Sequence, residues 1–266
     1  MNKDLKGKFA FTLGATHVGI FNNTRRVGFT LAEVLITLGI IGVVSAMTIP
    51  TLIKNYQEKA TVTKVKQAYS ILSQAYRLAI AENGPINYWE LETTPESYSH
   101  TKFANYLKPH LKLTADCIGE AEEYVSKYCT PIVFYKKAEN ASTFVLNNGM
   151  LVGVRIWSPK GNDYWANGLQ KFYGVILVMQ KGDKWEKGKT AFDFYIGENG
   201  IIPFGMQGTR IEFEKACNPN ISDPYPGYTS DDNMYGCTAW VIQKENMDYW
   251  ECPEKLGWNK ASSCDE

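Results

Sequence analysis

The feature that most constrains this chain is a run of 20 uncharged, mostly apolar residues at positions 34–53. At about 1.5 Å per residue, a helix of this length spans the hydrocarbon core of a bilayer. The preceding residues 1–28 are basic, with five lysines or arginines against one aspartate, a net charge of 5 − 1 = +4. A basic segment before an apolar run keeps the N-terminus cytoplasmic and sends the rest of the chain across the membrane. We therefore expect one membrane-spanning helix followed by an exported domain.

The six cysteines all follow the apolar run. An even number of cysteines in an exported domain predicts disulfides, and pairing each cysteine with its neighbour closes three local loops. Zinc is the alternative, although no pair has the CxxC spacing of many zinc sites. The residues after position 28 carry 23 − 27 = −4, so they offer no general attraction to nucleic acid. The expected pairs are Cys117–Cys129, Cys217–Cys237 and Cys252–Cys264.

One carboxylate, Glu33, lies at the leading end of the apolar run. A carboxylate near the centre of a membrane helix costs roughly 2.5–3.5 kcal/mol, less near its end, and usually has a function. A simple membrane anchor does not explain it, nor does a signal peptide cut after Ala46. If the chain were cut after Gly28, the new α-amino group of Phe29 would be a suitable cationic partner.

Residues 28–35 read Gly-Phe-Thr-Leu-Ala-Glu-Val-Leu and follow a pair of arginines. This stretch resembles the N-terminal signature of type IV pilins and type II secretion pseudopilins. In that family a prepilin peptidase cuts after the glycine and methylates the new N-terminal phenylalanine. The resemblance assigns these events to Gly28 and Phe29, and makes Glu33 the group that pairs with a neighbouring subunit's amine during assembly.

The same resemblance implies a location and a set of partners. The precursor would sit in the bacterial inner membrane with its C-terminal domain in the periplasm, and would later join a periplasmic or cell-surface filament. The implied partners are the prepilin peptidase, other pilin or pseudopilin subunits, an inner-membrane assembly platform and membrane lipid. Binding to nucleic acid is not expected.

The apolar helix itself is suited to packing among like helices. Gly42 and Ala46 form a small-xxx-small pair that permits close backbone approach, and Gly39 lies nearby. Pro50 lacks an amide hydrogen and clashes with the carbonyl of Ala46, which predicts a kink or local melting. Pro50 also falls where the pilin family commonly places its helix-breaking proline.

Beyond Pro50 the helical pattern continues in amphipathic form to Glu82, and Asn83-Gly84-Pro85 then stops it. We expect this part to cover a domain, whereas a long stalk beside the membrane is the alternative. The expected buried face consists of Ile53, Tyr56, Val65, Ala68, Leu72, Ala75, Tyr76 and Ala79.

The rest of the chain predicts an α+β fold. A second helix is expected within 99–113, and sequential strands with short turns imply an antiparallel sheet that packs on the long helix. The same arrangement is the pilin architecture, and a disulfide-tied C-terminal region resembles the variable region of pilins. The expected strands are 132–136, 143–147, 150–157, 172–180, 192–197 and a last short one at 238–243.

No catalytic or cofactor site stands out. The histidines give no nucleophile–base arrangement and no glycine-rich phosphate loop precedes a helix, so we do not expect an enzyme. Residues 178–182 correspond to the calcium loop of major pseudopilins but lack its aspartate. We therefore expect no cofactor, with calcium at Asp223, Asp231 and Asp232 as the alternative.

These observations predict a basic leader (1–28), a transmembrane and assembly helix (29–53) and an exported pilin-like domain (54–266). The favoured function is a structural subunit of a type IV pilus or type II secretion filament, and 266 residues suit a minor subunit better than a major one. One alternative is a minor pilin that acts as an adhesion or DNA-uptake module. Another is a singly anchored periplasmic protein that does not polymerise.

Overall fold

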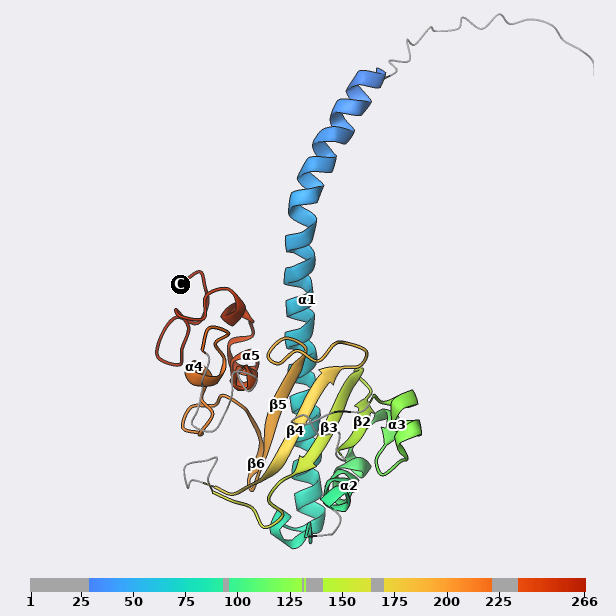
Figure 1. The fold of residues 1–266 in the computed structure, drawn as a ribbon, viewed down its shortest axis with the longest axis vertical. Coiled ribbons are helices and arrows are strands. Elements are labelled where there is room, and N and C mark those ends of the chain that lie inside the picture. Colours follow the sequence, from blue (N-terminus) through green and yellow to red (C-terminus); the bar gives the residue numbers. More distant parts are fainter. Residues whose placement is uncertain (1–28, 93–95, 131, 133–140, 164–169, 222–233) are drawn as a thin grey trace, which may run out of the picture. The chain divides into compact units, whose positions relative to one another are not determined.

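The computed structural model describes residues 29–92, 96–130, 132, 141–163, 170–221 and 234–266 (Figure 1). The chain divides into two compact units, Met1–Pro50 and Thr51–Glu266. Of the predicted strand at 132–136, only Ile132 belongs to the described residues.

Helix α1 runs from Leu31 to Asn83 and contains Pro50. It is helical at the proline, so the local melting expected there is not observed, and a kink stays a prediction. The helix ends where the sequence predicts. Gly84 has a φ of +78°, and its amide donates a hydrogen bond to the Ile80 carbonyl at 2.9 Å, as is common just beyond a helix C-terminus.

The buried face of α1 lies in its second half. The predicted face is confirmed from Val65 onward, whereas Ile53 and Tyr56 are exposed. The described sheet meets α1 from about Lys64, whose Nζ donates a hydrogen bond to Gln180 Oε1 at 2.7 Å. Ile53 and Tyr56 precede this packed part, which explains the error. The buried residues of α1 are Val62, Val65, Ala68, Leu72, Ala75, Tyr76 and Ala79.

The described sheet has six strands, all antiparallel, in the order β1-β2-β3-β4-β5-β6. Strands β2 to β5 lie close to their predicted positions, while β1 and β6 were not expected as strands. The two edges are short: β1 contains a register shift, and β6 ends at Pro203. The strands are β1 (Leu113–Cys117), β2 (Ser142–Leu146), β3 (Met150–Ile156), β4 (Phe172–Gln180), β5 (Ala191–Gly197) and β6 (Gly200–Pro203).

Both faces of this sheet are buried, so its central strands are apolar on both sides. One face packs on the second half of α1 (Figure 1). There Tyr69 stacks on Phe194 with ring centroids 5.6 Å apart, and the Tyr76 hydroxyl donates to the Gly197 carbonyl at 2.7 Å. These contacts confirm a long helix packed on an antiparallel sheet.

The connection between α1 and the sheet is helical in part. Helix α2 spans Glu96–Leu107 and passes into a 3-10 turn at Lys108–His110, so the helix predicted within 99–113 ends earlier. Pro109 lies in that turn, where its ring prevents the α-helix from continuing. The loop between Cys117 and Cys129 contains helix α3 (Glu122–Tyr128), and 3-10 turn η1 spans Ile86–Tyr88.

The C-terminal region contains short helices instead of the predicted strand at 238–243. That segment is helix α5 (Thr238–Lys244), which follows directly on 3-10 turn η5 (Tyr235–Cys237). A short apolar run does not by itself distinguish helix from strand, and here four consecutive residues of α5 are buried. The remaining elements are helix α4 (Phe213–Ala216) and 3-10 turn η6 (Asp248–Trp250).

Three disulfides tie the described domain together. They join Cys117 to Cys129, Cys217 to Cys237 and Cys252 to Cys264, as the sequence predicts. The second bridge is buried beside a tight approach of two segments. Gly205 there has a φ of +93°, and a Cβ at this position would lie 1.8 Å from the Gly236 carbonyl oxygen.

Candidate functional site

The start of α1 brings together the residues that the sequence marks for processing and assembly. Phe29 and Thr30 precede the helix, and the Phe29 side chain is 87% exposed. Glu33 lies in the first turn and is also exposed. Gly28 lies outside the described residues, so its predicted role as the cleavage position stays a prediction.

Thr30 and Glu33 form a reciprocal set of hydrogen bonds. Glu33 Oε2 accepts from the Thr30 amide and from the Thr30 hydroxyl, both at 2.8 Å. The Thr30 hydroxyl oxygen accepts from the Glu33 amide at 3.2 Å. This is a capping box, in which two amides that the helix leaves without partners are satisfied. This second role of Glu33 was not predicted, although Thr-x-x-Glu before an apolar run is the sequence signature of a capping box.

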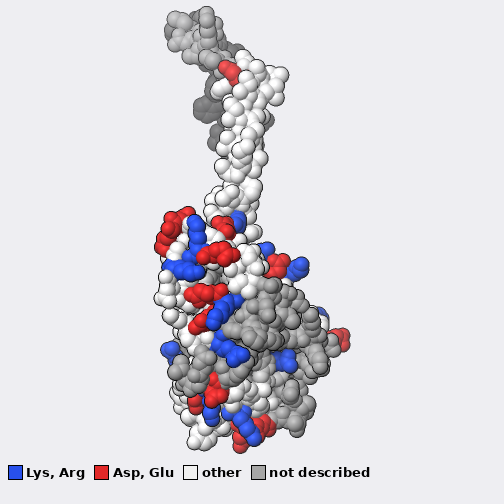
Figure 2. Space-filling view, turned by 60° about the vertical axis from the view of Figure 1, so that its left-hand side comes forward, with Lys and Arg blue, Asp and Glu red and all other residues white. Residues whose placement is uncertain are grey.

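The apolar half of α1 is an exposed surface in this chain. Its large apolar side chains are exposed and, in Figure 2, its surface is uncharged except for one carboxylate near its start, as the sequence requires. By length and composition α1 can cross a membrane, and none of its apolar window is buried. The hydroxyls of Thr37 and Thr48 donate to the carbonyls of Val34 and Val44, each at 3.0 Å, so this surface needs no water to satisfy them.

The small residues of that surface have no packing partner within the described chain. A Cβ added to Gly39 or to Gly42 would meet nothing within 4 Å. Internal packing therefore does not require glycine at either position. The predicted contacts of Gly39, Gly42 and Ala46 with other helices remain a prediction.

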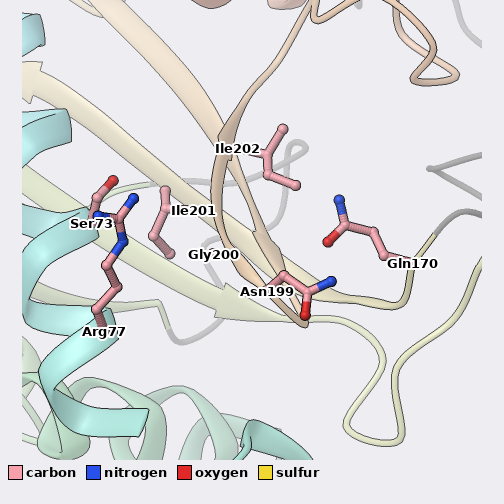
Figure 3. Close-up of a pocket in the computed structure, with 7 residues that line it drawn as sticks. All are labelled: Ser73, Arg77, Gln170, Asn199, Gly200, Ile201 and Ile202. Atoms are coloured by element: carbon pink, nitrogen blue, oxygen red, sulfur yellow. The ribbon is translucent and has the colours of Figure 1, made fainter. Parts of the chain in front are cut away.

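A small cavity lies between α1 and the hairpin that joins β5 to β6. It has a volume of about 200 Å³, and the side chains of Ser73 and Arg77 project from α1 toward Ile201 (Figure 3). Ser73 Oγ and Gln170 Oε1 are buried and have no hydrogen-bond partner among the described residues. The space suffices for several water molecules, which could satisfy both atoms.

One histidine and one aspartate, His100 and Asp193, are buried in the part of the domain that the structure describes. His100 Nδ1 accepts a hydrogen bond from the Ile156 amide at 3.0 Å, and burial together with the Arg155 charge lowers the pKa of His100 to about 4. Asp193 in β5 is buried, and burial raises its pKa to about 8 against an opposing effect of Lys187. Both groups are therefore neutral at pH 7, and they belong to the packing of the domain.

No group of three or more metal-ligating side chains occurs among the residues that the structure describes. The alternative calcium ligands Asp223, Asp231 and Asp232 lie outside those residues. The expectation of no cofactor stays a prediction.

Comparison with known proteins separates the chain into the same two parts. A model of the prokaryotic N-terminal methylation motif matches residues 25–49. A model described as a family of unknown function (DUF6613) matches residues 51–254, well over half of the chain. No curated protein and no solved structure matches the chain.

The first match confirms the type IV pilin and pseudopilin signature. Together with the exposed apolar helix, it supports a membrane-anchored, pilin-like or pseudopilin precursor, and a structural role rather than catalysis. The signature also implies processing by a prepilin peptidase and assembly with other subunits. The chain belongs to the family of unknown function DUF6613 and carries that family's domain behind the N-terminal methylation motif of pilin-like precursors.

Proposed function

We propose that this chain is a minor subunit of a type IV pilus or type II secretion filament, made as a membrane-anchored precursor. A prepilin peptidase cuts after Gly28 and methylates Phe29, and residues 54–266 lie on the periplasmic side of the inner membrane before assembly. The observation that carries this proposal is the methylation motif at 25–49, most of which lies in the first part of α1, where the large apolar side chains are exposed. The function needs no cofactor.

The exposed apolar half of α1 supports assembly through helix packing. Lipid covers this surface in the precursor, and neighbouring helices cover it in a filament. Gly39 and Gly42 leave open space that another backbone can occupy, and Ala46 extends the same small-residue surface by one turn. Packing through this half of α1 requires no conformational change in the domain that follows.

Glu33 supplies the polar contact of the assembled helices. In the precursor its carboxylate is satisfied by Thr30. Cleavage after Gly28 creates an ammonium group at Phe29, and a charge-assisted hydrogen bond to such a group is stronger than one to a neutral amide. The pairing between Glu33 and the amine of a neighbouring subunit then sets the register of the two helices.

Mass spectrometry of the N-terminus tests the processing step. Protein from its native membranes should lack residues 1–28 and carry one additional methyl group on Phe29. The variant Gly28→Val should retain the leader, because a branched side chain replaces hydrogen at the scissile bond. Gly19→Val is the matched control within the leader and should be processed normally.

An intact leader in the wild type, or a cut after Ala46, would contradict the proposal and favour a plain anchor or signal peptide. The composition of sheared filaments tests assembly. A minor subunit is present there at low abundance, whereas a processed protein that stays in the membrane and never enters filaments is a singly anchored periplasmic protein.

A further inference from the structure

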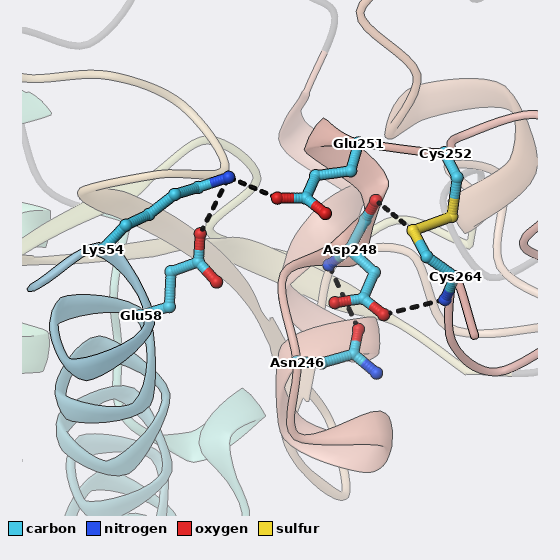
Figure 4. A network of polar contacts seen from close by, with 7 residues as sticks. All are labelled: Lys54, Glu58, Asn246, Asp248, Glu251, Cys252 and Cys264. Carbon is cyan, nitrogen blue, oxygen red and sulfur yellow. Dashed lines mark hydrogen bonds and ion pairs between the residues drawn. A yellow bond between two sulfur atoms is a disulfide. The ribbon is translucent and has the colours of Figure 1, made fainter. Parts of the chain in front are cut away.

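Lys54 is the first charged residue after the apolar run, and it contacts the C-terminal loop, which we define as residues 245–264. Lys54 Nζ forms an ion pair with Glu251 and lies 3.9 Å from the Glu58 carboxylate (Figure 4). The hydrogen bond to Glu251 raises the pKa of Lys54, so the ammonium stays charged. Both partners belong to the Thr51–Glu266 unit. The contact places Glu251 beside the first turn that follows the apolar run.

The C-terminal loop is held by a disulfide and by hydrogen bonds among its own residues. The Cys252–Cys264 disulfide closes it, and Asp248 Oδ2 accepts a hydrogen bond from the Cys264 amide at 2.9 Å (Figure 4). Asn246 Oδ1 accepts from the Asp248 amide at 3.2 Å. The loop therefore holds a defined shape next to Lys54.

A second loop, residues 181–190 between β4 and β5, meets the first. The Gly188 carbonyl accepts hydrogen bonds from the Tyr249 hydroxyl at 2.6 Å and from Trp250 Nε1 at 3.0 Å. At one end of the sheet Gln180 contacts α1 at Lys64, and at the opposite end Gly197 contacts Tyr76. The 181–190 loop thus lies at the end of the sheet nearer to Lys54 (Figure 1).

Each of these two loops presents an exposed indole. Trp185 is 37% exposed and Trp250 is 38% exposed, whereas Trp89 and Trp240 are fully buried. The amphipathic indole ring favours the membrane–water interface, where its apolar body and its polar N–H are both accommodated.

We propose that Trp185 and Trp250 form an interfacial patch that lies among the lipid headgroups of the membrane that residues 34–53 span. Lys54 directly follows the apolar run, so it lies at the membrane border when that run is inserted. Glu251 contacts Lys54 and Trp250 precedes Glu251, which brings Trp250 near this border. The Trp250 indole donates to Gly188, three residues after Trp185, so the second loop lies beside it. The inference rests on the membrane insertion in the proposed function, but not on cleavage or filament assembly.

The charges of the two loops indicate that the indoles, rather than net charge, make this contact. Residues 181–190 carry four lysines and two carboxylates, 4 − 2 = +2. Residues 245–264 carry four carboxylates and two lysines, 2 − 4 = −2. The charges of the two loops therefore cancel, so salt should weaken the contact little.

Tryptophan fluorescence of the full chain in vesicles tests the patch, because all seven tryptophans lie beyond residue 88 and none lies in the apolar run. The chain is reconstituted into phosphatidylcholine vesicles in which a fraction of the lipid carries a headgroup nitroxide quencher. We expect quenching of the wild type, at low and at high salt alike. The double variant Trp185→Phe/Trp250→Phe should lose most of that quenching.

Trp157→Phe is the matched control, because Trp157 follows β3 at the opposite end of the sheet and its removal should leave unchanged the absolute amount of fluorescence that the quencher removes. Flotation of the vesicles reports insertion independently. Protein that floats without quenching, or a double variant quenched like the wild type, overturns the patch but leaves the anchor intact. Protein that does not float overturns both the patch and the membrane anchor on which it rests.

Discussion

The Glu33 carboxylate accepts two hydrogen bonds from Thr30, one from its amide and one from its hydroxyl, both at 2.8 Å. One carboxylate therefore has two partners in succession under the proposed function. It caps its own helix in the precursor, and it pairs with the amine of another subunit after cleavage.

Two single substitutions separate these roles. Glu33→Gln keeps an oxygen that can complete the capping box but removes the charge, so we expect normal cleavage and loss of the subunit from filaments. Thr30→Ala keeps the charge and removes the cap, at a cost of about 1 kcal/mol in helix stability, and should still assemble. The measurement is the ratio of subunit in sheared filaments to subunit in membranes. Wild-type incorporation of the Glu33→Gln protein would refute the charge pairing.

Gly205 should tolerate no side chain. In Gly205→Ala the new Cβ meets the Gly236 carbonyl oxygen at 1.8 Å, so the segment at Gly205 and the segment at Gly236 must move apart. We expect a loss of more than about 4 kcal/mol in the free energy of unfolding, or failure to fold.

Gly208→Ala is the control for that experiment. Gly208 also has a positive φ, +82°, but a Cβ there meets nothing within 4 Å. Its substitution should cost only the backbone strain, about 1–2 kcal/mol, in denaturant unfolding of the full chain in detergent. Equal losses in the two variants would show that the close approach at Gly205 does not matter.

His100 should make the domain less stable in acid. Its pKa of about 4 in the folded state lies below the value of 6.5 for an exposed histidine, so between these values the unfolded chain binds a proton that the folded chain does not. Stability therefore falls as the pH drops from about 6.5 to about 4, by a total on the order of 3 kcal/mol. His100→Asn should remove this part of the pH dependence in denaturant unfolding, and an unchanged slope would contradict the assignment.

Asp193 should make the domain less stable as the pH rises. Its pKa of about 8 in the folded state lies above that of an exposed aspartate, so the folded chain holds a proton that the unfolded chain releases. Stability is lost as the pH rises from about 4 to about 8. The stability of Asp193→Asn relative to the wild type should therefore increase with pH over that range. The control is Asp183→Asn, at an exposed aspartate of the preceding loop, which should change the free energy of unfolding by less than about 0.5 kcal/mol at pH 7.

The fold could be predicted where one physical signal dominates. The apolar period marks the buried face of α1 from Val65, and Asn83-Gly84-Pro85 ends the helix. The three disulfides follow from pairing neighbouring cysteines. The segment at 238–243 could not be assigned by this reasoning, because its helical state depends on burial against partners far away in the chain, such as Thr238 accepting a hydrogen bond from the Asp193 amide.

In the candidate site, too, local features could be predicted from the sequence and long-range contacts could not. The signature around Phe29 and Glu33 could be recognised because the Glu33 charge and its spacing from Phe29 lie within a few residues of sequence. The capping box joins Thr30 and Glu33, which are three residues apart, so its signal is equally local, although it was not predicted. The contact between Lys54 and Glu251 joins residues 197 positions apart, so no local pattern could indicate it.

The two edge strands of the described sheet are poorly suited to pairing with another molecule. Strand β6 is four residues long and ends at Pro203, which has no amide hydrogen, and β1 is short with a shifted register. Neither edge is a good template for a strand of another molecule. Copies crowded together in one patch of membrane are thereby protected from sheet-to-sheet aggregation. Under the proposed function, the long helix is then the surface through which such copies associate.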